Sequence, residues 1–233
     1  MIINQIHFPI YGVIILVSIG MGMFYIYHNI EKEKRKNLYL YFILYLSFAL
    51  IFGKLFTILT SFEKVDILTA GISSLGGVIG TILAAYIYEK IENHENKVMK
   101  YTILSLPLVY GLSKIACFLV GCCYGIPYDG IGYVIYPAGL NEKLFPIQMV
   151  ETIVFLLIFI LLHKNKEKKG ILTITLLVCT ITKFLLDFLR YDHIKKIFTI
   201  NQIVCMIFMG VIVFLYFKKG KKNEYRRVKT KTN

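Results

Sequence analysis

The chain has 233 residues, of which 57% are hydrophobic and 18% are charged, and its formal net charge is +13. A soluble domain of this length carries more charge, and its helices have one apolar face instead of being apolar all round. The composition therefore excludes an ordinary soluble enzyme and favours a protein that crosses a membrane several times. The excess positive charge would suggest nucleic-acid binding in a soluble chain, but here it is concentrated in short connections and in the C-terminal segment.

Seven predominantly apolar runs are long enough to cross a bilayer as α-helices, which takes about 20 residues. The first run has no basic region before it and no small-residue cleavage site, so we expect a span and not a removable signal peptide. The sequence predicts an all-α, polytopic membrane protein with about seven transmembrane helices. Residues 1–217 would form a single transmembrane domain, and residues 218–233 a basic cytoplasmic tail. The runs are Ile10–Tyr27, Leu38–Thr60, Ile67–Ile87, Tyr101–Leu119, Pro146–Leu162, Gly170–Leu189 and Asn201–Phe217.

Connections rich and poor in positive charge alternate along the chain. Clusters of lysine and arginine follow the first, third, fifth and seventh runs, the last of them from Lys218 onward. The other connections hold only Lys64, Lys143, Arg190, Lys195 and Lys196. Because positive connections stay in the cytoplasm, we expect the N-terminus and the loop Gly121–Phe145 outside and the C-terminus inside. We expect the tail from Lys218 to be disordered and to lie against the membrane.

Several charged residues lie within or beside the apolar runs. Lys54 lies in the second run, Lys114 in the fourth, and Lys183 and Asp187 in the sixth, with Arg190 just after it. Lys183 and Asp187 are four residues apart, so on a helix they share a face and can form an ion pair. One interpretation is that these charges pair or snorkel only to permit insertion. The other is that several cations converge on one anion site, for which the natural anion in a membrane is a lipid phosphate.

Three further segments carry residues that have more than one interpretation. Residues 73–80 read Ser-Ser-Leu-Gly-Gly-Val-Ile-Gly, which favours close helix packing, with backbone access for a ligand as the alternative. Tyr11 is either an interfacial anchor or a hydrogen-bonding group in a site. Gln148 and Glu151 lie one turn apart at the start of the fifth run. Glu151 would cap the helix, pair with a lysine or position a substrate.

The cysteines do not have the spacing of a disulfide framework or of a paired zinc knuckle. Cys122 and Cys123 are adjacent, and they would either close a strained ring or remain unpaired. A metal site would need further ligands, and the sequence shows no matching motif for His94, His163 and His193. We therefore predict no metal site. The cysteines expected to serve packing within the runs are Cys117, Cys179 and Cys205.

Seven short segments extend over most of the chain, from Pro9 to about Val211. They are Pro9–Gly12, Phe52–Lys54, Gly76–Gly80, Lys114–Gly125, Phe145–Glu151, Lys183–Arg190 and Asn201–Gln202. In order, spacing and placement on the runs, they resemble the prolipoprotein diacylglyceryl transferase family. The resemblance implies a multi-pass enzyme of the bacterial cell membrane. It would move a diacylglyceryl group from phosphatidylglycerol to a cysteine thiol of a lipoprotein precursor.

The resemblance also implies the parts that individual residues play. Catalytic roles fall on Lys114, Glu151, Lys183 and Asp187. Substrate binding falls on Tyr11, Lys54, Gly76, Gly77, Cys117, Cys122, Gly125, Gln148 and Arg190. Lys114 and Lys183 would stabilise the departing phosphate, with Arg190 at the mouth of the site. The implied partners are phosphatidylglycerol, a lipoprotein precursor peptide and the membrane, with no nucleic acid and no cofactor.

The chain departs from the family pattern at several of these positions. The family's histidine before the Gly-Gly pair is Leu75, and its fourth-span arginine is Lys114. A nearby asparagine is Cys117, and a glutamate is Cys122. Lysine keeps the charge of arginine but loses its bidentate fork. Two hypotheses follow: a divergent transferase, which uses the standard acceptor or another one, and a catalytically inactive relative that binds or passes phospholipid or another small anion.

Overall fold

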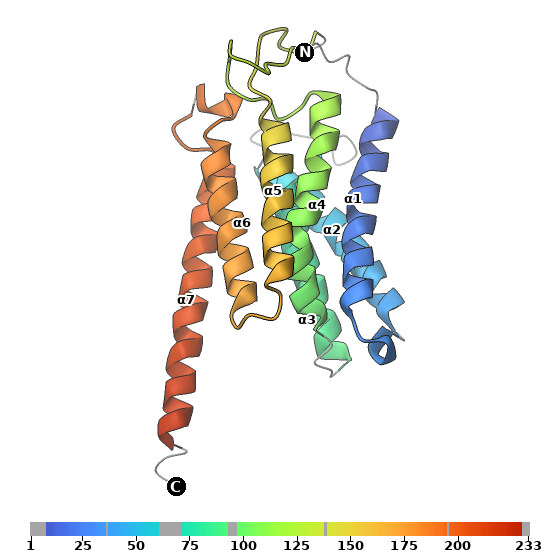
Figure 1. The fold of residues 1–233 in the computed structure, drawn as a ribbon, viewed down its shortest axis with the longest axis vertical. Helices are drawn as coiled ribbons and strands as arrows, with labels where there is room; N and C mark the ends of the chain where they lie inside the picture. The colour runs from blue at the N-terminus through green and yellow to red at the C-terminus, as the bar shows by residue number, and fades with distance from the viewer. Residues whose placement is uncertain are drawn as a thin grey trace.

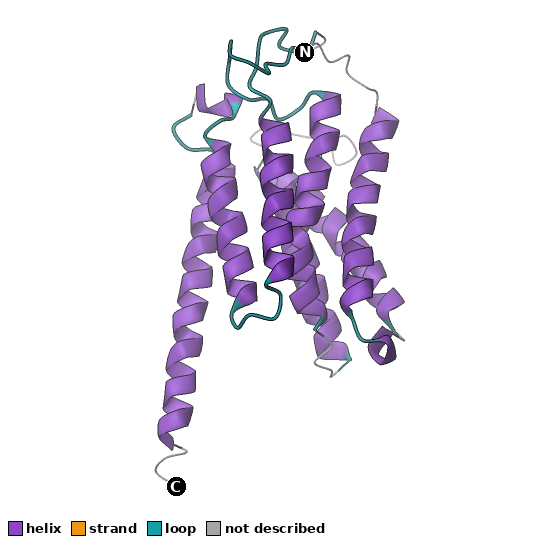
Figure 2. Ribbon diagram, in the orientation of Figure 1, coloured by secondary structure: helices purple, strands orange, loops and turns teal. Residues whose placement is uncertain are grey.

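The computed structural model describes residues 8–35, 37–60, 71–92, 97–137, 139–194 and 196–229. Over these residues the fold is all-helical and has no strand (Figure 2). The α-helices are α1 (Phe8–Asn29), α2 (Leu38–Thr60), α3 (Ser74–Ile91), α4 (Val98–Val120), α5 (Ile147–Lys164), α6 (Ile171–Asp187) and α7 (Ile200–Lys229). Two short 3-10 helices, η1 (Lys32–Arg35) and η2 (Tyr191–Ile194), lie in the connections. Each predicted run therefore corresponds to one helix.

Two boundaries differ from the prediction by more than four residues. The third helix begins at Ser74 and not at Ile67, because Ser73 has an extended backbone and forms the N-cap. The tail from Lys218 was expected to be disordered, but α7 continues as a helix to Lys229 (Figure 1). This extension is rich in lysine and arginine, which favour helix, and it contains no proline to end it. Four residues named in the sequence analysis, Lys64, Ile67, His94 and Lys195, lie outside the described residues.

Helix α4 lies at the centre of the bundle and contacts α1, α3, α5 and α6 (Figure 1). Its buried residues occur on all sides, as expected of a helix surrounded by others. Four helices, α1, α2, α4 and α5, are long and apolar enough to cross a membrane. Large apolar side chains are exposed on α1, α2 and α5, among them Val13, Leu16, Phe24, Ile43, Ile51, Ile153 and Leu157. Such a surface suits contact with lipid.

The glycines of residues 73–80 bring α3 into direct contact with α2. A Cβ atom added at Gly76 would lie 2.3 Å from the carbonyl oxygen of Phe52. At Gly80 it would lie 2.2 Å from the carbonyl oxygen of Phe48. Only residues without a side chain permit this approach of two backbones. The packing interpretation of this segment is confirmed.

The positively charged connections meet at one end of the bundle. There Lys97 pairs with Glu31 at 3.2 Å, and Lys100 with Glu167 at 2.9 Å. At the other end, the segment 121–145 packs onto the C-terminus of α4, where the Tyr136 hydroxyl donates to the carbonyl of Phe118 at 3.0 Å. This segment also contacts the connection between α6 and α7 (Figure 1). Among the described residues, the connections rich in positive charge therefore lie at one end of the bundle, and those poor in positive charge lie at the other.

We predict that Gly80→Ala destabilises the protein by about 1–3 kcal/mol, because the new methyl group has to displace the α2 backbone. The matched control is Gly77→Ala on the same helix, where the nearest atom to a new Cβ is 3.8 Å away. Thermal unfolding of both variants in detergent measures the difference. Equal stability of the two variants would contradict the close α2–α3 contact.

Candidate functional site

Five charged side chains from three helices and one connection meet inside the bundle. They are Lys114 on α4, Glu151 on α5, Lys183 and Asp187 on α6, and Arg190 in the connection from α6 to α7. All five are at most 7% exposed. We call this set the ion cluster.

Glu151 is the centre of the ion cluster and is fully buried. The Nη2 atom of Arg190 donates to both of its carboxylate oxygens at 2.9 Å. The Nζ atom of Lys183 lies 3.3 Å from Oε1, and that of Lys114 lies 3.4 Å from Oε2. The Tyr110 hydroxyl donates to Oε1 at 2.8 Å. One carboxylate therefore holds three cations in place.

Asp187 ties the same cations to α6 and α7. Its Oδ1 atom accepts a hydrogen bond from the Nζ atom of Lys183 at 2.9 Å and lies 3.0 Å from the Nε atom of Arg190. The ion pair predicted from the four-residue spacing of Lys183 and Asp187 is confirmed. The Thr199 hydroxyl donates to Oδ2 of Asp187. Thr199 also caps α7, since its hydroxyl accepts a bond from the Gln202 backbone at 3.2 Å.

The ion cluster has more positive than negative charge. Three cations face two carboxylates, which leaves one net positive charge in a buried place. Burial disfavours the charged form of Arg190, but the carboxylate of Glu151 outweighs this and holds the pKa of Arg190 above its ordinary value. A buried excess charge is costly unless an opposite charge compensates it. The cluster is therefore suited to receive an anion.

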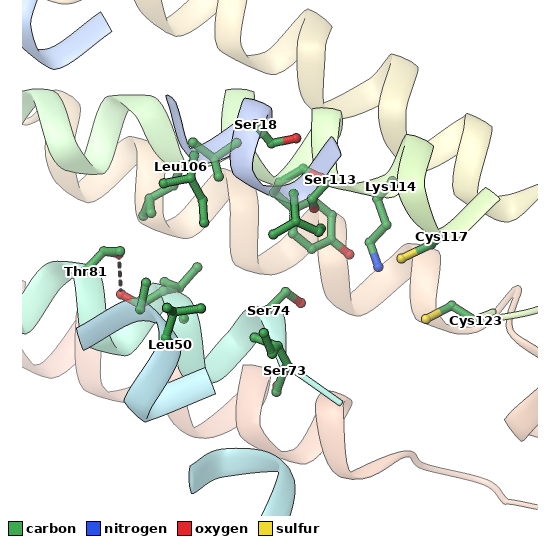
Figure 3. Close-up of a pocket in the computed structure, with 18 of the residues that line it drawn as sticks. Ser18, Leu50, Ser73, Ser74, Thr81, Leu106, Ser113, Lys114, Cys117 and Cys123 are labelled. Carbon is green, nitrogen blue, oxygen red and sulfur yellow. Dashed lines mark hydrogen bonds between the residues drawn. The ribbon is translucent and has the colours of Figure 1, made fainter. Parts of the chain in front are cut away.

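A cavity of about 270 Å³ opens beside the ion cluster (Figure 3). Lys114, Lys183 and Arg190 line one part of it, and Figure 3 shows the Lys114 ammonium pointing into the space. Lining residues with hydroxyl groups include Tyr11, Ser18, Ser73, Ser74, Thr81 and Ser113. Apolar lining residues include Ile15, Leu50, Ile72, Val78, Leu106 and Val109. The cavity thus offers cations at one place and apolar walls at another, which fits an amphiphilic molecule with an anionic group.

The residues singled out in the sequence divide into two groups in space. Those that line the cavity are Tyr11, Gly77, Lys114, Cys117, Cys122, Lys183 and Arg190. Those that do not line it are Lys54, Gly76, Gly125, Gln148, Glu151 and Asp187. Arg190, expected at the mouth of the site, is instead buried with its guanidinium on Glu151.

Gly125 and Gln148 support the walls of the cavity. A Cβ atom at Gly125 would lie 2.2 Å from the carbonyl oxygen of Phe145, so this position requires glycine. Gly125 pairs with Arg190 in an antiparallel bridge, which fixes the backbone that carries the guanidinium. The Gln148 side chain donates to the carbonyl of Cys122 at 2.7 Å. Both residues therefore hold the loop against the helices.

Two residues of the site were not identified from the sequence. Tyr110 lies four residues before Lys114, so it shares its helix face, and its ring lies 4.9 Å from the Lys114 ammonium. Thr199 begins the sequence Thr-Ile-Asn-Gln, which has the spacing of a capping box. Helix periodicity and capping chemistry could have found both. Nothing in the sequence shows that the capping hydroxyl also contacts Asp187.

Three thiol groups also meet at the cavity. The Sγ atoms of Cys117, Cys122 and Cys123 all lie within 4.8 Å of one another. The sequence predicted no metal site, because no histidine motif matches the cysteines and Cys117 was expected to serve packing. Among the described residues, these three cysteines form a possible set of metal ligands.

Comparison with known proteins gives a consistent set of relatives. A family model described as prolipoprotein diacylglyceryl transferase matches residues 1–218. The phosphatidylglycerol–prolipoprotein diacylglyceryl transferase of Clostridium tetani (strain Massachusetts / E88) is 31% identical over 153 residues, which is 60% of this chain and 61% of that protein. The protein of the same name from Clostridioides difficile (strain 630) is 29% identical over 166 residues, 66% of this chain and 64% of the relative. The chain spans about three fifths of the length of the curated relatives it matches.

We predict that Glu151→Gln destabilises the protein by about 3–5 kcal/mol, because three buried cations lose their central carboxylate. The matched control is Glu167→Gln, which alters an exposed pair with Lys100 at the other end of the bundle and leaves the unfolding temperature unchanged. Thermal unfolding in detergent compares the two variants. If Glu151→Gln unfolds at the temperature of the control, the ion cluster does not hold the helices together.

Proposed function

The chain belongs to the prolipoprotein diacylglyceryl transferase family, and we propose that it is a membrane transferase. It moves a diacylglyceryl group from phosphatidylglycerol to the cysteine thiol of a lipoprotein precursor. The observation that carries this proposal is the ion cluster, whose net positive charge faces a cavity with apolar walls. The curated relatives have this activity in their names.

The cavity matches the donor lipid in two respects. The phosphate diester of phosphatidylglycerol is an anion, and it would lie against the cations Lys114 and Lys183. The apolar lining includes residues of α1, α2, α3 and α4, where the acyl chains would lie. Serine and tyrosine hydroxyls, including those of Tyr11 and Ser113, would bind the headgroup oxygens.

The reaction is a nucleophilic displacement at carbon. The acceptor thiolate forms a carbon–sulfur bond to the glycerol carbon, and the carbon–oxygen bond to the phosphate breaks. The bonding electrons stay on that oxygen, so glycerol phosphate leaves with an additional negative charge. Lys114 and Lys183 would stabilise this charge more in the transition state than in the bound lipid. Glu151 and Asp187 do not line the cavity, so we assign them as positioning residues that hold the cations.

We place the protein in the bacterial cell membrane, with seven spans, the N-terminus outside and the C-terminus in the cytoplasm. The positively charged connections lie together at one end of the bundle, which supports this orientation. The loop 121–145 is then outside. Its residues Cys122 and Cys123 line the cavity, so the site would open toward the side on which exported precursors arrive.

The second candidate is an inactive relative that binds or passes phospholipid or another small anion. It is favoured by Leu75, which occupies the position of the family's histidine. Leu75 lines a second, smaller cavity of about 80 Å³, where Pro107 and Leu176 are among its neighbours. No proton acceptor stands at this position.

We predict that Lys114→Ala and Lys183→Ala each lower product formation by about 10²–10³-fold, because each removes one cation from the departing phosphate. The assay incubates purified protein with phosphatidylglycerol and a lipobox peptide, and mass spectrometry measures the diacylglyceryl thioether. The control is Lys143→Ala, an exposed lysine paired with Asp129 in the outer loop, which keeps full activity.

Lipid retained by the purified variants separates the two candidates. An enzyme loses product formation in the lysine variants, whereas a binding protein loses only the retained phosphatidylglycerol. If the unaltered protein leaves the lipobox peptide unmodified and does not rescue cells depleted of their own transferase, the proposed activity is wrong.

A further inference from the structure

The end of α4 is built so that three cysteines approach one another. Gly121 ends the helix in the left-handed conformation, with φ of 70°. The backbone N–H groups of Gly121 and Cys122 both donate to the carbonyl of Cys117, at 3.1 and 3.0 Å. Cys123 is also left-handed, with φ of 56°, a conformation that is uncommon for a residue with a side chain. These two residues reverse the chain and bring Cys122 and Cys123 back to Cys117.

The three sulfurs have the spacing of ligands around one ion. A tetrahedral zinc ion with Zn–S bonds of about 2.3 Å holds its sulfur ligands about 3.8 Å apart. The three Sγ atoms already lie within 4.8 Å of one another, so movements of about 1 Å complete the geometry. Thiolate sulfur is a soft ligand that selects zinc and copper(I) over magnesium and calcium.

A disulfide accounts for the cluster less well. All three cysteines are free in the structure. Adjacent residues such as Cys122 and Cys123 have Cα atoms about 3.8 Å apart, below the usual range of about 4.4–6.8 Å for a disulfide. A bridge from Cys117 to either of them would leave the third thiol unused. The cluster as a whole is explained by a shared ion.

The surroundings supply the charge and the open side that a reactive metal site needs. Three thiolates and one zinc(II) ion carry a net charge of −1, and the cations Lys114 and Arg190 line the same cavity. All three cysteines also line this cavity. Figure 3 shows the sulfurs of Cys117 and Cys123 beside the Lys114 ammonium. With three protein ligands, the fourth position of the ion faces the substrate space, as in catalytic zinc sites.

We propose that Cys117, Cys122 and Cys123 bind one zinc(II) ion, and that its fourth position takes the thiol of the acceptor cysteine. This inference rests on the proposed transferase function. The acceptor S–H loses its proton to water when the sulfur binds zinc, since a coordinating thiol is deprotonated outright. The zinc-bound sulfur then forms the bond to the glycerol carbon as the carbon–oxygen bond breaks toward the phosphate. The ion thus generates the acceptor thiolate, which Leu75 cannot do because its apolar side chain accepts no proton.

The first experiment measures metal binding by the full-length protein, purified under reducing conditions and stripped with a chelator. Cobalt(II) replaces zinc as the probe, because its thiolate complexes absorb light. The unaltered protein is expected to bind one cobalt ion per chain with a thiolate charge-transfer band. Cys123→Ser is expected to lose affinity by more than the roughly 10–100-fold that removal of an outer-shell partner costs.

Two further variants keep this result interpretable. Cys123 is exposed, so its substitution leaves the core intact, whereas Cys117 is buried; helical content and unfolding temperature are therefore measured for both variants. Cys179→Ser, which changes a cysteine away from the cluster, is expected to bind cobalt like the unaltered protein. Absence of the charge-transfer band, equal binding by Cys123→Ser, or a disulfide among the three cysteines would each overturn the proposal.

The second experiment tests the fourth position without any turnover. Adding a lipobox peptide to the cobalt-loaded protein is expected to shift the charge-transfer band, and the same peptide with serine in place of cysteine is expected not to. An unchanged spectrum with the cysteine peptide would overturn the role of the metal. A shifted spectrum without thioether product, by contrast, would support the metal site and contradict the proposed transferase activity.

Discussion

The arrangement of this protein depends on one buried carboxylate. Glu151 contacts Lys114, Lys183 and Arg190, which come from α4, α6 and the connection to α7. An unpaired cation inside an apolar bundle is costly, so the position of each of these segments is fixed by where its charge can be compensated. Because Glu151 and Asp187 together neutralise only two of the three cations, the same contacts that hold the helices together leave one positive charge for a ligand. Glu151 therefore both holds the helices together and positions the cations that a ligand would meet.

The outer loop completes the site that Glu151 organises. Glycine at position 125 lets the loop approach Phe145 and pair with the Arg190 backbone, and Gln148 fixes the turn that carries Cys122. Two positions at which the chain departs from the family pattern, Cys117 and Cys122, also line the cavity here. The resemblance implies an asparagine and a glutamate at these two positions, whereas here the sulfurs of Cys117 and Cys122 lie close to that of Cys123. In the sequence these cysteines suggest only a loss of polar groups, but in the structure they form a possible set of metal ligands together with Cys123.

Much of the fold could be predicted from the sequence, because bilayer spans have a simple composition and a known length. Each predicted run corresponds to a helix, and the pairing of Lys183 with Asp187 follows from helical periodicity. The exceptions are local. The start of α3 depends on the cap at Ser73. The tail is helical because lysine and arginine favour helix, whereas its high charge led us to expect disorder.

The site was less predictable, because contacts between distant segments leave no periodic signal. The role of Glu151 required the packing of α5 against α4 and α6, and the bond from Thr199 to Asp187 required the turn before α7. Cys117 was assigned to packing because a lone cysteine in an apolar run gives no sign that a left-handed turn will bring two others to it.

The most direct test of the central claim is an experimental structure of the protein with phosphatidylglycerol bound. The ion cluster as an anion site predicts that the lipid phosphate lies within hydrogen-bonding distance, about 2.7–3.2 Å, of the ammonium groups of Lys114 and Lys183. A phosphate bound elsewhere, with both lysines contacting only Glu151 and Asp187, would contradict it.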